Sequence, residues 1–176
     1  MIKVKDKSFI LFLDEKTIQK RISELGFEIS RDFESKNPVI VGVLNGSFMF
    51  LSDLSKKITV EAEVTFIKIS SYSGESSTGK VKNLIGLESK LEGRHVIVVE
   101  DIVDTGLSML HLTQQLHEIN PASISLVTLL YKPEALKYNI PLDYVGFEIP
   151  NKFVVGYGLD YDGYGRNFPE IYQLKL

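Results

Sequence analysis

The chain has 176 residues, of which 44% are hydrophobic, and a formal net charge of −3 at pH 7. This slightly acidic balance excludes bulk electrostatic attraction to nucleic acid or to acidic membranes. The sequence has no Cys, which excludes a disulfide framework and a thiolate metal site. We expect one domain over residues 1–176, with a core of ordinary size.

The amino-terminal segment alternates charged and apolar residues, with Lys3, Lys5 and Lys7, and lacks the apolar core of a signal peptide. No apolar run in the sequence reaches the roughly 20 residues that cross a bilayer. We therefore expect a cytoplasmic protein that has neither membrane nor nucleic acid as a partner.

The first predicted element is a helix with one buried stripe. Ile18, Ile22, Leu25, Ile29 and Phe33 recur at steps of three and four residues, which is the helical period. Later strands alternate with helices, a pattern that predicts an α/β fold with a doubly wound, mainly parallel central sheet flanked by helices. Ligands of such folds bind outside the carboxyl ends of the strands. The further predicted elements are strands over 39–44, 63–70, 83–87, 96–99, 123–130, 144–147 and 153–155, helices from 48 and from 110, and an exposed polar loop over 71–82.

The most informative segment covers residues 96–108. Its β-branched run over 96–99 predicts a buried parallel strand, and Glu100 and Asp101 follow directly. A loop with Asp104 then leads into an amphipathic helix, whose free N–H groups and dipole make an anion cradle. Acidic side chains beside a phosphate site can bind sugar hydroxyls or a metal ion. Together these features suggest a phosphorylated ribose as the ligand.

Helix capping is the simpler interpretation of part of this segment. Asp and Thr are common caps, which would explain Asp104 or Thr105 alone. Capping does not explain Glu100 and Asp101 beside a buried strand, because ionised acids are costly there unless they are paired, solvated or coordinated. The combination is therefore more specific than any of its members.

Residues 98–106 resemble the phosphoribosyl-diphosphate signature of the type I phosphoribosyltransferases. Four motifs between Val39 and Tyr164 occur in the family's order, and the chain as a whole resembles the hypoxanthine (hypoxanthine-guanine) phosphoribosyltransferases. The resemblance implies a small hood formed by the terminal segments and a mobile lid loop. It also implies purine salvage with Mg²⁺ as cofactor: the 5-phosphoribosyl group of 5-phospho-α-D-ribosyl 1-diphosphate moves to N9 of a 6-oxopurine, giving IMP or GMP and diphosphate.

By this resemblance, the acidic segment holds the ribose and carries the proton transfer. Glu100 and Asp101 bind the ribose hydroxyls, with a magnesium ion nearby, and Asp104 is the general base or acid at purine N7. The residues that hold the 5′-phosphate are Asp104, Thr105, Gly106, Leu107 and Ser108.

Two loops are assigned to diphosphate by the resemblance. The first contains Leu44, Asn45 and Gly46, where the residues alone favour a plain turn capped by the next residue, Ser47. Many relatives carry a basic residue in place of Asn45, so contacts here must come from backbone N–H groups or the neutral amide. The second contains Ser71 and Tyr72, which close as a lid and exclude water, although such loops are more often solvated hairpin tips.

The purine is assigned to the carboxyl-terminal part of the chain. By resemblance, Lys132 donates to the 6-oxo oxygen and Phe153 stacks on the ring, with Lys152 and Val154 beside it at the purine edge. From the residues alone, Lys132 is a solvated charge and Phe153 a core residue.

Two further residues complete the set that the resemblance implies. Asp160 adjoins the purine and carries a second magnesium ion bound to diphosphate, and Arg166 contacts diphosphate, which its planar fork suits. The resemblance also implies a homodimer or a homotetramer. Phe48 and Phe50 are expected to lie either in the interface of this assembly or in the core of the subunit.

Three other classes of protein are alternatives to this interpretation of the sequence. A phosphoribosyltransferase for xanthine or a pyrimidine would share the acids but lack the combination of Lys132 with Phe153 and Val154. A nucleic-acid-binding regulator of this fold would show a basic face or lose Asp104 or the lid. A nucleotide-binding dehydrogenase would carry a G-x-G-x-x-G fingerprint, which the sequence lacks after its first predicted central strand. His95, His111 and His117 show no catalytic pairing and are interpreted as surface or helix residues.

Overall fold

The computed structural model describes residues 1–69 and 91–175. The predicted loop over 71–82, with Ser71 and Tyr72, and the predicted strand over 83–87 lie outside the described residues. In the part of the chain that is described, no helix is both long and apolar enough to cross a membrane.

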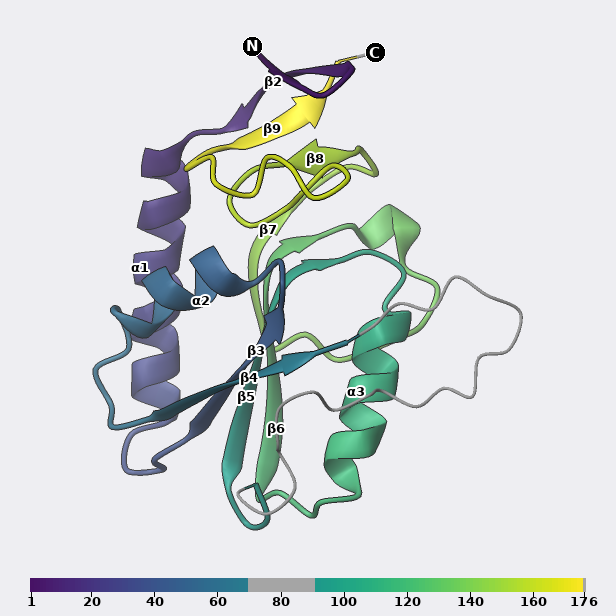
Figure 1. The fold of residues 1–176 in the computed structure, drawn as a ribbon. Coiled ribbons are helices and arrows are strands. Elements are labelled where there is room, and N and C mark those ends of the chain that lie inside the picture. Colours follow the sequence, from purple (N-terminus) through teal and green to yellow (C-terminus); the bar gives the residue numbers. More distant parts are fainter. Residues whose placement is uncertain (70–90, 176) are drawn as a thin grey trace.

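A five-stranded sheet forms the centre of the molecule, in the order β4-β3-β5-β6-β7 (Figure 1). Each neighbouring pair of its strands is parallel, which confirms the predicted doubly wound arrangement. The carboxyl ends of the strands therefore lie at one edge of the sheet. Its strands are β3 (Val39–Leu44), β4 (Glu63–Lys68), β5 (His95–Val103), β6 (Ser123–Tyr131) and β7 (Tyr144–Glu148).

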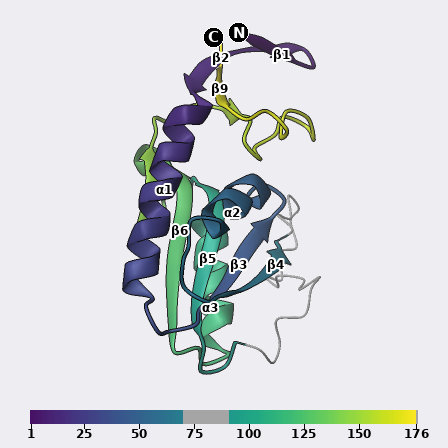
Figure 2. The same cartoon turned by 90° about the vertical axis from the view of Figure 1, so that its left-hand side faces the viewer.

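Helices cover both faces of this sheet (Figure 2). Helices α1 (Glu15–Asp32) and α2 (Phe48–Ser55) lie on one face, and α3 (Leu107–His117) lies on the other. Alternation along β5 supplies both cores: Ile97 and Val99 pack with α1 and α2, whereas Val96 and Val98 pack with α3. The buried stripe predicted for α1 is confirmed.

A second sheet stands above the carboxyl ends of the central strands (Figure 1). It is antiparallel, in the order β1-β2-β9-β8, and confirms the hood expected from the terminal segments. The sequence patterns did not predict β1, β2 or β9. The hood strands are β1 (Ile2–Val4), β2 (Lys7–Leu13), β8 (Val154–Val155) and β9 (Ile171–Leu174).

Strand β5 is longer than predicted. Glu100, Ile102 and Val103 continue the ladder with β6, because β6 itself extends to Tyr131. The prediction that Glu100 and Asp101 follow the strand was therefore wrong: both lie within it. The polar loop begins only at Asp104.

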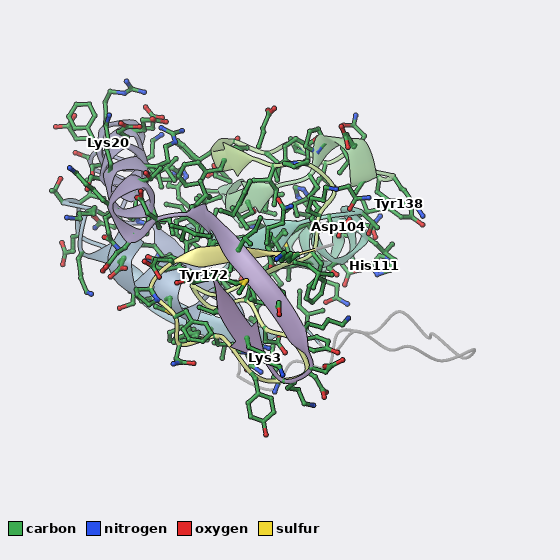
Figure 3. The ribbon with its side chains drawn as sticks, turned by 90° about the horizontal axis from the view of Figure 1, so that it is seen from above. Lys3, Lys20, Asp104, His111, Tyr138 and Tyr172 are labelled. Atoms are coloured by element: carbon green, nitrogen blue, oxygen red, sulfur yellow. The ribbon has the colours of Figure 1, made fainter. Side chains whose placement is uncertain are left out.

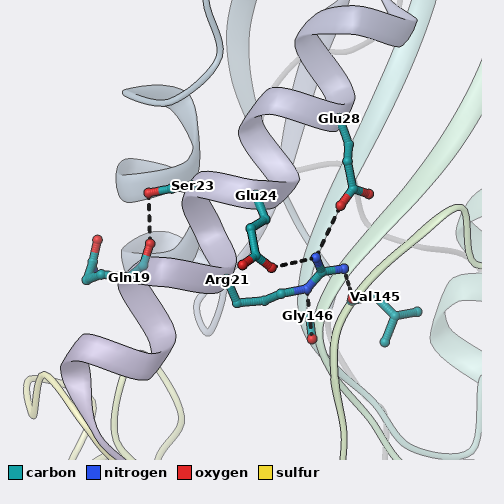
Figure 4. Close-up of polar contacts among 7 residues, drawn as sticks. All are labelled: Gln19, Arg21, Ser23, Glu24, Glu28, Val145 and Gly146. Atoms are coloured by element: carbon teal, nitrogen blue, oxygen red, sulfur yellow. Dashed lines mark hydrogen bonds and ion pairs between the residues drawn. The ribbon is translucent and has the colours of Figure 1, made fainter.

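Arg21 fastens α1 to the edge strand β7 (Figure 4). Its guanidinium donates to the carbonyls of Gly146 and Val145, at 3.2 and 2.9 Å, and also pairs with Glu24 and Glu28, each at 3.1 Å. Strand β7 lies at the edge of the sheet, and two successive carbonyls of this strand accept from Arg21. Arg21 satisfies both of them and fixes the position of α1 on the sheet.

Candidate active site

Three segments meet at the carboxyl end of β5. A Cβ added at Gly46 would lie 1.6 Å from Asp101 Oδ2, and one added at Gly158 would lie 2.0 Å from the Gly46 carbonyl oxygen. The loop after β3 is therefore packed between the acidic strand and the turn over 156–160. Only glycine permits this approach. The Leu44–Asn45 peptide bond in this loop is cis.

Ser47 does not cap α2 as the simpler interpretation of this loop requires. It occupies the N-cap position, but its buried hydroxyl donates back to the Val43 carbonyl at 2.7 Å. The N–H groups at the start of α2 therefore receive no bond from the Ser47 side chain.

The adjacent acids of β5 have different environments. Asp101 is buried, and its Oδ1 accepts the Ile102 N–H at 2.8 Å. Glu100 is half-buried, and burial together with the neighbouring Asp101 carboxyl raises the pKa of Glu100 well above its usual value. A ligand that binds the ionised form of Glu100 must therefore displace a proton or offset its charge.

Asp104 forms an ion pair with Lys132. The Lys132 ammonium donates to Asp104 Oδ2 at 3.0 Å, and the Lys132 backbone N–H donates to the Val103 carbonyl at 3.0 Å. Lys132 is buried, so the interpretation of an exposed, solvated lysine is wrong. The pair joins the loop after β5 to the end of β6, and Figure 3 shows Asp104 on the same side of the molecule as His111.

The loop after Asp104 leads into an uncapped helix. Gly106 is the N-cap of α3 with φ 84°, and as a glycine it has no side chain that could cap this helix. The Thr105 hydroxyl accepts a long hydrogen bond from the Leu107 N–H, at 3.4 Å. The capping interpretation is therefore wrong for Asp104, whereas Thr105 bonds one N–H of the helix start. The other N–H groups of the first turn, together with Ser108, are available to an anion.

The segment after Lys132 supports this cradle. The Thr105 carbonyl accepts N–H bonds from Lys137 at 3.0 Å and Tyr138 at 3.1 Å. A Cβ at Gly106 would lie 2.7 Å from the Tyr138 carbonyl oxygen. Glycine thus allows the lysine segment and the cradle to pack against each other.

Phe153 directly precedes the hood strand β8 and is 43% exposed, so the core interpretation is wrong. Phe9 and Tyr161 support it, with ring centroids 6.3 and 5.9 Å away, and the Lys7 ammonium lies 5.9 Å from the ring. Val154, in β8, is buried next to it, whereas Lys152 is exposed. The arrangement offers a supported aromatic surface, and sequence reasoning missed the contributions of Phe9 and Lys7.

Asp160 and Arg166 form a second ion pair. Asp160 Oδ1 accepts from Arg166 Nη2 at 2.6 Å, and Oδ2 accepts the Gly163 N–H at 2.6 Å. Arg166 Nη1 also donates to the Gly158 carbonyl at 2.6 Å. Arg166 and Asp160 are thereby connected, through Gly158, to the loop of Gly46 and to Asp101.

The donor set suits a magnesium ion that is held partly by substrate. Within residues 1–69 and 91–175 no three His, Asp or Glu side chains form a metal cluster. Mg²⁺ is usually bound by one or two carboxylates together with phosphate oxygens and waters, which Glu100 and Asp101 can match. Asp160 matches less directly, since both of its oxygens already accept bonds.

The three histidines show no catalytic arrangement in the described structure. His95 Nδ1 lies 2.8 Å from the Ser123 hydroxyl at the amino ends of β5 and β6, at the far edge from Asp104. His111 and His117 lie on α3. The interpretation as surface or helix residues therefore holds for His111 and His117, but it is wrong for His95, which is a half-buried residue of strand β5.

The parallel sheet, the uncapped helix start and the acids of β5 agree with the match to a family model. The phosphoribosyl transferase domain matches residues 12–162. The chain belongs to the phosphoribosyltransferase family.

Particular relatives narrow the comparison. The hypoxanthine-guanine phosphoribosyltransferase of Dictyostelium discoideum is 44% identical over 92% of each chain. The hypoxanthine-guanine-xanthine phosphoribosyltransferase of Tritrichomonas foetus is 45% identical over 90% of this chain and 87% of its own. The hypoxanthine phosphoribosyltransferase of Trypanosoma cruzi, solved with the product IMP, has a TM-score of 0.88 at 38% identity and covers 99% of this chain and 98% of its own.

Proposed function

We propose that this protein is a magnesium-dependent hypoxanthine-guanine phosphoribosyltransferase. The ion pair between Lys132 and Asp104 carries the proposal, because it places a donor for a 6-oxo group beside a carboxylate that can take a proton. The names of the relatives support the same substrates.

In this proposal the 5′-phosphate binds the start of α3, and the ribose hydroxyls bind Glu100 and Asp101. The purine stacks on Phe153 and accepts a hydrogen bond from Lys132 at its 6-oxo oxygen. N9 forms a bond to C1′ as the bond from C1′ to diphosphate breaks, and Asp104 accepts the proton held at N7. A magnesium ion, when bound, offsets the negative charge of the leaving diphosphate.

The backbone of Asn45 and Gly46, together with Arg166, is assigned to the diphosphate. Arg166 already donates to the Gly158 carbonyl, which keeps its guanidinium beside this loop. Asp160 is assigned to a second magnesium ion and Lys152 and Val154 to the purine edge, while Ser71 and Tyr72 are assigned to the lid. The protein contributes positioning and electrostatic stabilisation rather than covalent catalysis.

A substrate panel tests the proposal. The protein is incubated with 5-phosphoribosyl diphosphate, magnesium and one of hypoxanthine, guanine, xanthine, adenine or uracil, and nucleotide formation is followed. We expect turnover of hypoxanthine and guanine that stops when EDTA removes the metal. Turnover of adenine or uracil alone would contradict the proposal, and xanthine decides whether this chain shares the range named for its T. foetus relative.

The proposal includes a homodimer or homotetramer in the cytoplasm. Phe50 is fully buried and belongs to the core, whereas Phe48 is 42% exposed on α2, where it can serve an interface. Analytical ultracentrifugation of the wild-type protein and Phe48→Ser tests this role. A single monomeric species for the wild-type protein would contradict the assembly.

A further inference from the structure

A partly buried hydrogen-bond network connects the turn after the hood strand β8 to both helices on one face of the sheet. The Tyr157 hydroxyl donates to Asp53 Oδ2 at 2.6 Å, and Gln19 Nε2 donates to the same oxygen at 2.6 Å. Gln19 belongs to α1 and Asp53 to α2, whereas Tyr157 lies 104 residues further along the chain from Asp53. None of the three belongs to the residues assigned to substrate.

Tyr157 is the anchor of the turn that covers the loop of Gly46. Its side chain is 1% exposed, and its backbone has φ 50°, a left-handed conformation that non-glycine residues rarely adopt. Its N–H donates to the Phe168 carbonyl at 2.8 Å. The bond to Asp53 therefore fixes an unusual conformation whose next residue, Gly158, rests on the Gly46 carbonyl.

Charge strengthens this bond. Burial opposes the charge on Asp53, but hydrogen bonds from Tyr157, Gln19 and Lys56 outweigh it and lower the pKa of Asp53. Burial and the Asp53 carboxylate raise the pKa of Tyr157. The pair thus consists of an ionised carboxylate and a neutral phenol, and a hydrogen bond to a charged acceptor is stronger than a neutral one.

We propose that Asp53 is a positioning residue for the diphosphate end of the site, acting through Tyr157. By holding the turn over 156–160, it keeps Gly158 on the Gly46 carbonyl and Arg166 on the Gly158 carbonyl. The backbone of the Gly46 loop and the guanidinium of Arg166 are thereby held at a fixed separation. This role rests on the proposed function, because that function assigns both groups to diphosphate.

The proposal makes a kinetic distinction. Loss of the bond between Asp53 and Tyr157 moves groups assigned to diphosphate, whereas Lys132 and Asp104 are fixed by separate contacts at the ends of β5 and β6. The KM for 5-phosphoribosyl diphosphate should therefore rise while the KM for hypoxanthine changes little. Small displacements of positioned groups have large kinetic effects, so we expect a rise of about fivefold or more.

Tyr157→Phe is the main test variant, since it removes only the hydroxyl. Asp53→Asn and Asp53→Ala form a second pair, in which Asn retains an oxygen that can accept from Tyr157 and Ala does not. Tyr144→Phe is the matched control. Its hydroxyl donates to Asp32 at 2.9 Å, again joining a tyrosine to a helix carboxylate, but at the amino end of β7, opposite the site.

Both KM values, kcat and the melting temperature are measured for each variant. Amide hydrogen exchange of peptides that cover residues 44–47 provides a readout that does not depend on activity. The proposal is supported if Tyr157→Phe and Asp53→Ala selectively raise the KM for the diphosphate donor and speed exchange over 44–47, with Asp53→Asn closer to wild type and Tyr144→Phe unchanged in both.

The opposite results overturn it. Equal changes in both KM values, or a lower melting temperature with wild-type kinetics and exchange, would show that the network only stabilises the fold. If the wild-type protein fails the substrate panel, the proposed function fails by itself. Exchange over 44–47 then decides whether the bond positions that loop: faster exchange in Tyr157→Phe, but not in Tyr144→Phe, supports positioning, and equal exchange contradicts it.

Discussion

Lys132 reaches Asp104 from inside the protein: the lysine side chain is 9% exposed, the carboxylate 48%, and the two atoms lie 3.0 Å apart. The pair joins β6 to the loop after β5 at the place proposed for the purine. A purine that uses both residues binds across an existing ion pair. Substitution of either residue therefore changes the electrostatic environment of the other.

Asp104→Asn is predicted to lower kcat by about 10²–10⁴, the usual range for loss of a general acid or base. The amide keeps the size of the side chain but cannot take the proton from N7. Affinity for 5-phosphoribosyl diphosphate, measured by titration calorimetry with magnesium, should change much less. Wild-type turnover by the variant would show that Asp104 does not handle the proton.

Lys132→Met is predicted to depress activity on hypoxanthine far more than it weakens binding of the diphosphate donor. Lys132 offers only hydrogen-bond donors, which match a 6-oxo oxygen and oppose the 6-amino group of adenine. Two opposed donors in a dry pocket leave both unsatisfied, so the wild-type protein should reject adenine by orders of magnitude. Steady-state kinetics with both purines test this, and normal hypoxanthine kinetics in the variant would refute it.

The acid pair of β5 should govern binding of the donor with its metal. Replacing Glu100 and Asp101 by Gln and Asn removes the charge from hydrogen bonds to the ribose hydroxyls, bonds of roughly 1.5–3 kcal/mol each when one partner is charged. Donor affinity in magnesium, measured by calorimetry, should fall accordingly. Unchanged affinity would mean that the two acids are structural.

Glu100 should also make the stability of the protein depend on pH. Burial and Asp101 raise the pKa of Glu100 in the folded state above the ordinary 4.5, so the folded state holds the proton more tightly than the unfolded state. Below about pH 4.5 the residue has little effect. Its unfavourable contribution grows as the pH rises to the folded-state pKa. Glu100→Gln should therefore be more stable than wild type at pH 7, and denaturant titrations should show the difference shrinking toward pH 4; a constant difference contradicts this.

Gly158→Ala should be far more destabilising than an ordinary glycine substitution. Its φ is +99°, and the new Cβ would lie 2.0 Å from the Gly46 carbonyl oxygen. Gly93→Ala is the control, because Gly93 has φ +67° but no atom within 4 Å of the added Cβ. The control should lose about 1–2 kcal/mol from the left-handed backbone. Gly158→Ala should lose roughly 1–3 kcal/mol more from overpacking. Urea unfolding measures the free energy of unfolding of both variants. Equal losses would show that the turn over 156–160 accommodates the added methyl group without overpacking.

The central sheet could be predicted because its signals are local. Residues 39–44 form a strand with the predicted limits, since every position but the last is buried and the run is bounded by Pro38 and a polar loop. The extension of β5 through Glu100 to Val103 could not be predicted, because the partner strand β6 determines it. Propensity is overridden there by pairing.

The hood and part of the candidate site could not be predicted from local sequence patterns. Strand β2 buries only Phe9 fully and pairs with β9 more than 150 residues later, so neither strand shows a clear alternation by itself. Tyr157 stands between two glycines, a pattern typical of a turn, but nothing in the sequence predicts its hydrogen bond to Asp53. Lys132 and Asp104, which lie 28 residues apart, were proposed as site residues by resemblance, and their direct contact emerged only from the fold.

The position of β9 also bears on how the protein matures during synthesis. Ile171–Leu174 is inserted between β2 and β8, so the hood is closed by a strand made after nearly everything it touches. The strands of the central sheet, the last of which ends at Glu148, are all synthesised before β9. The surface beneath Phe153, however, stays unfinished until residue 174 has left the exit tunnel. Each molecule should therefore become compact before it can bind its substrates.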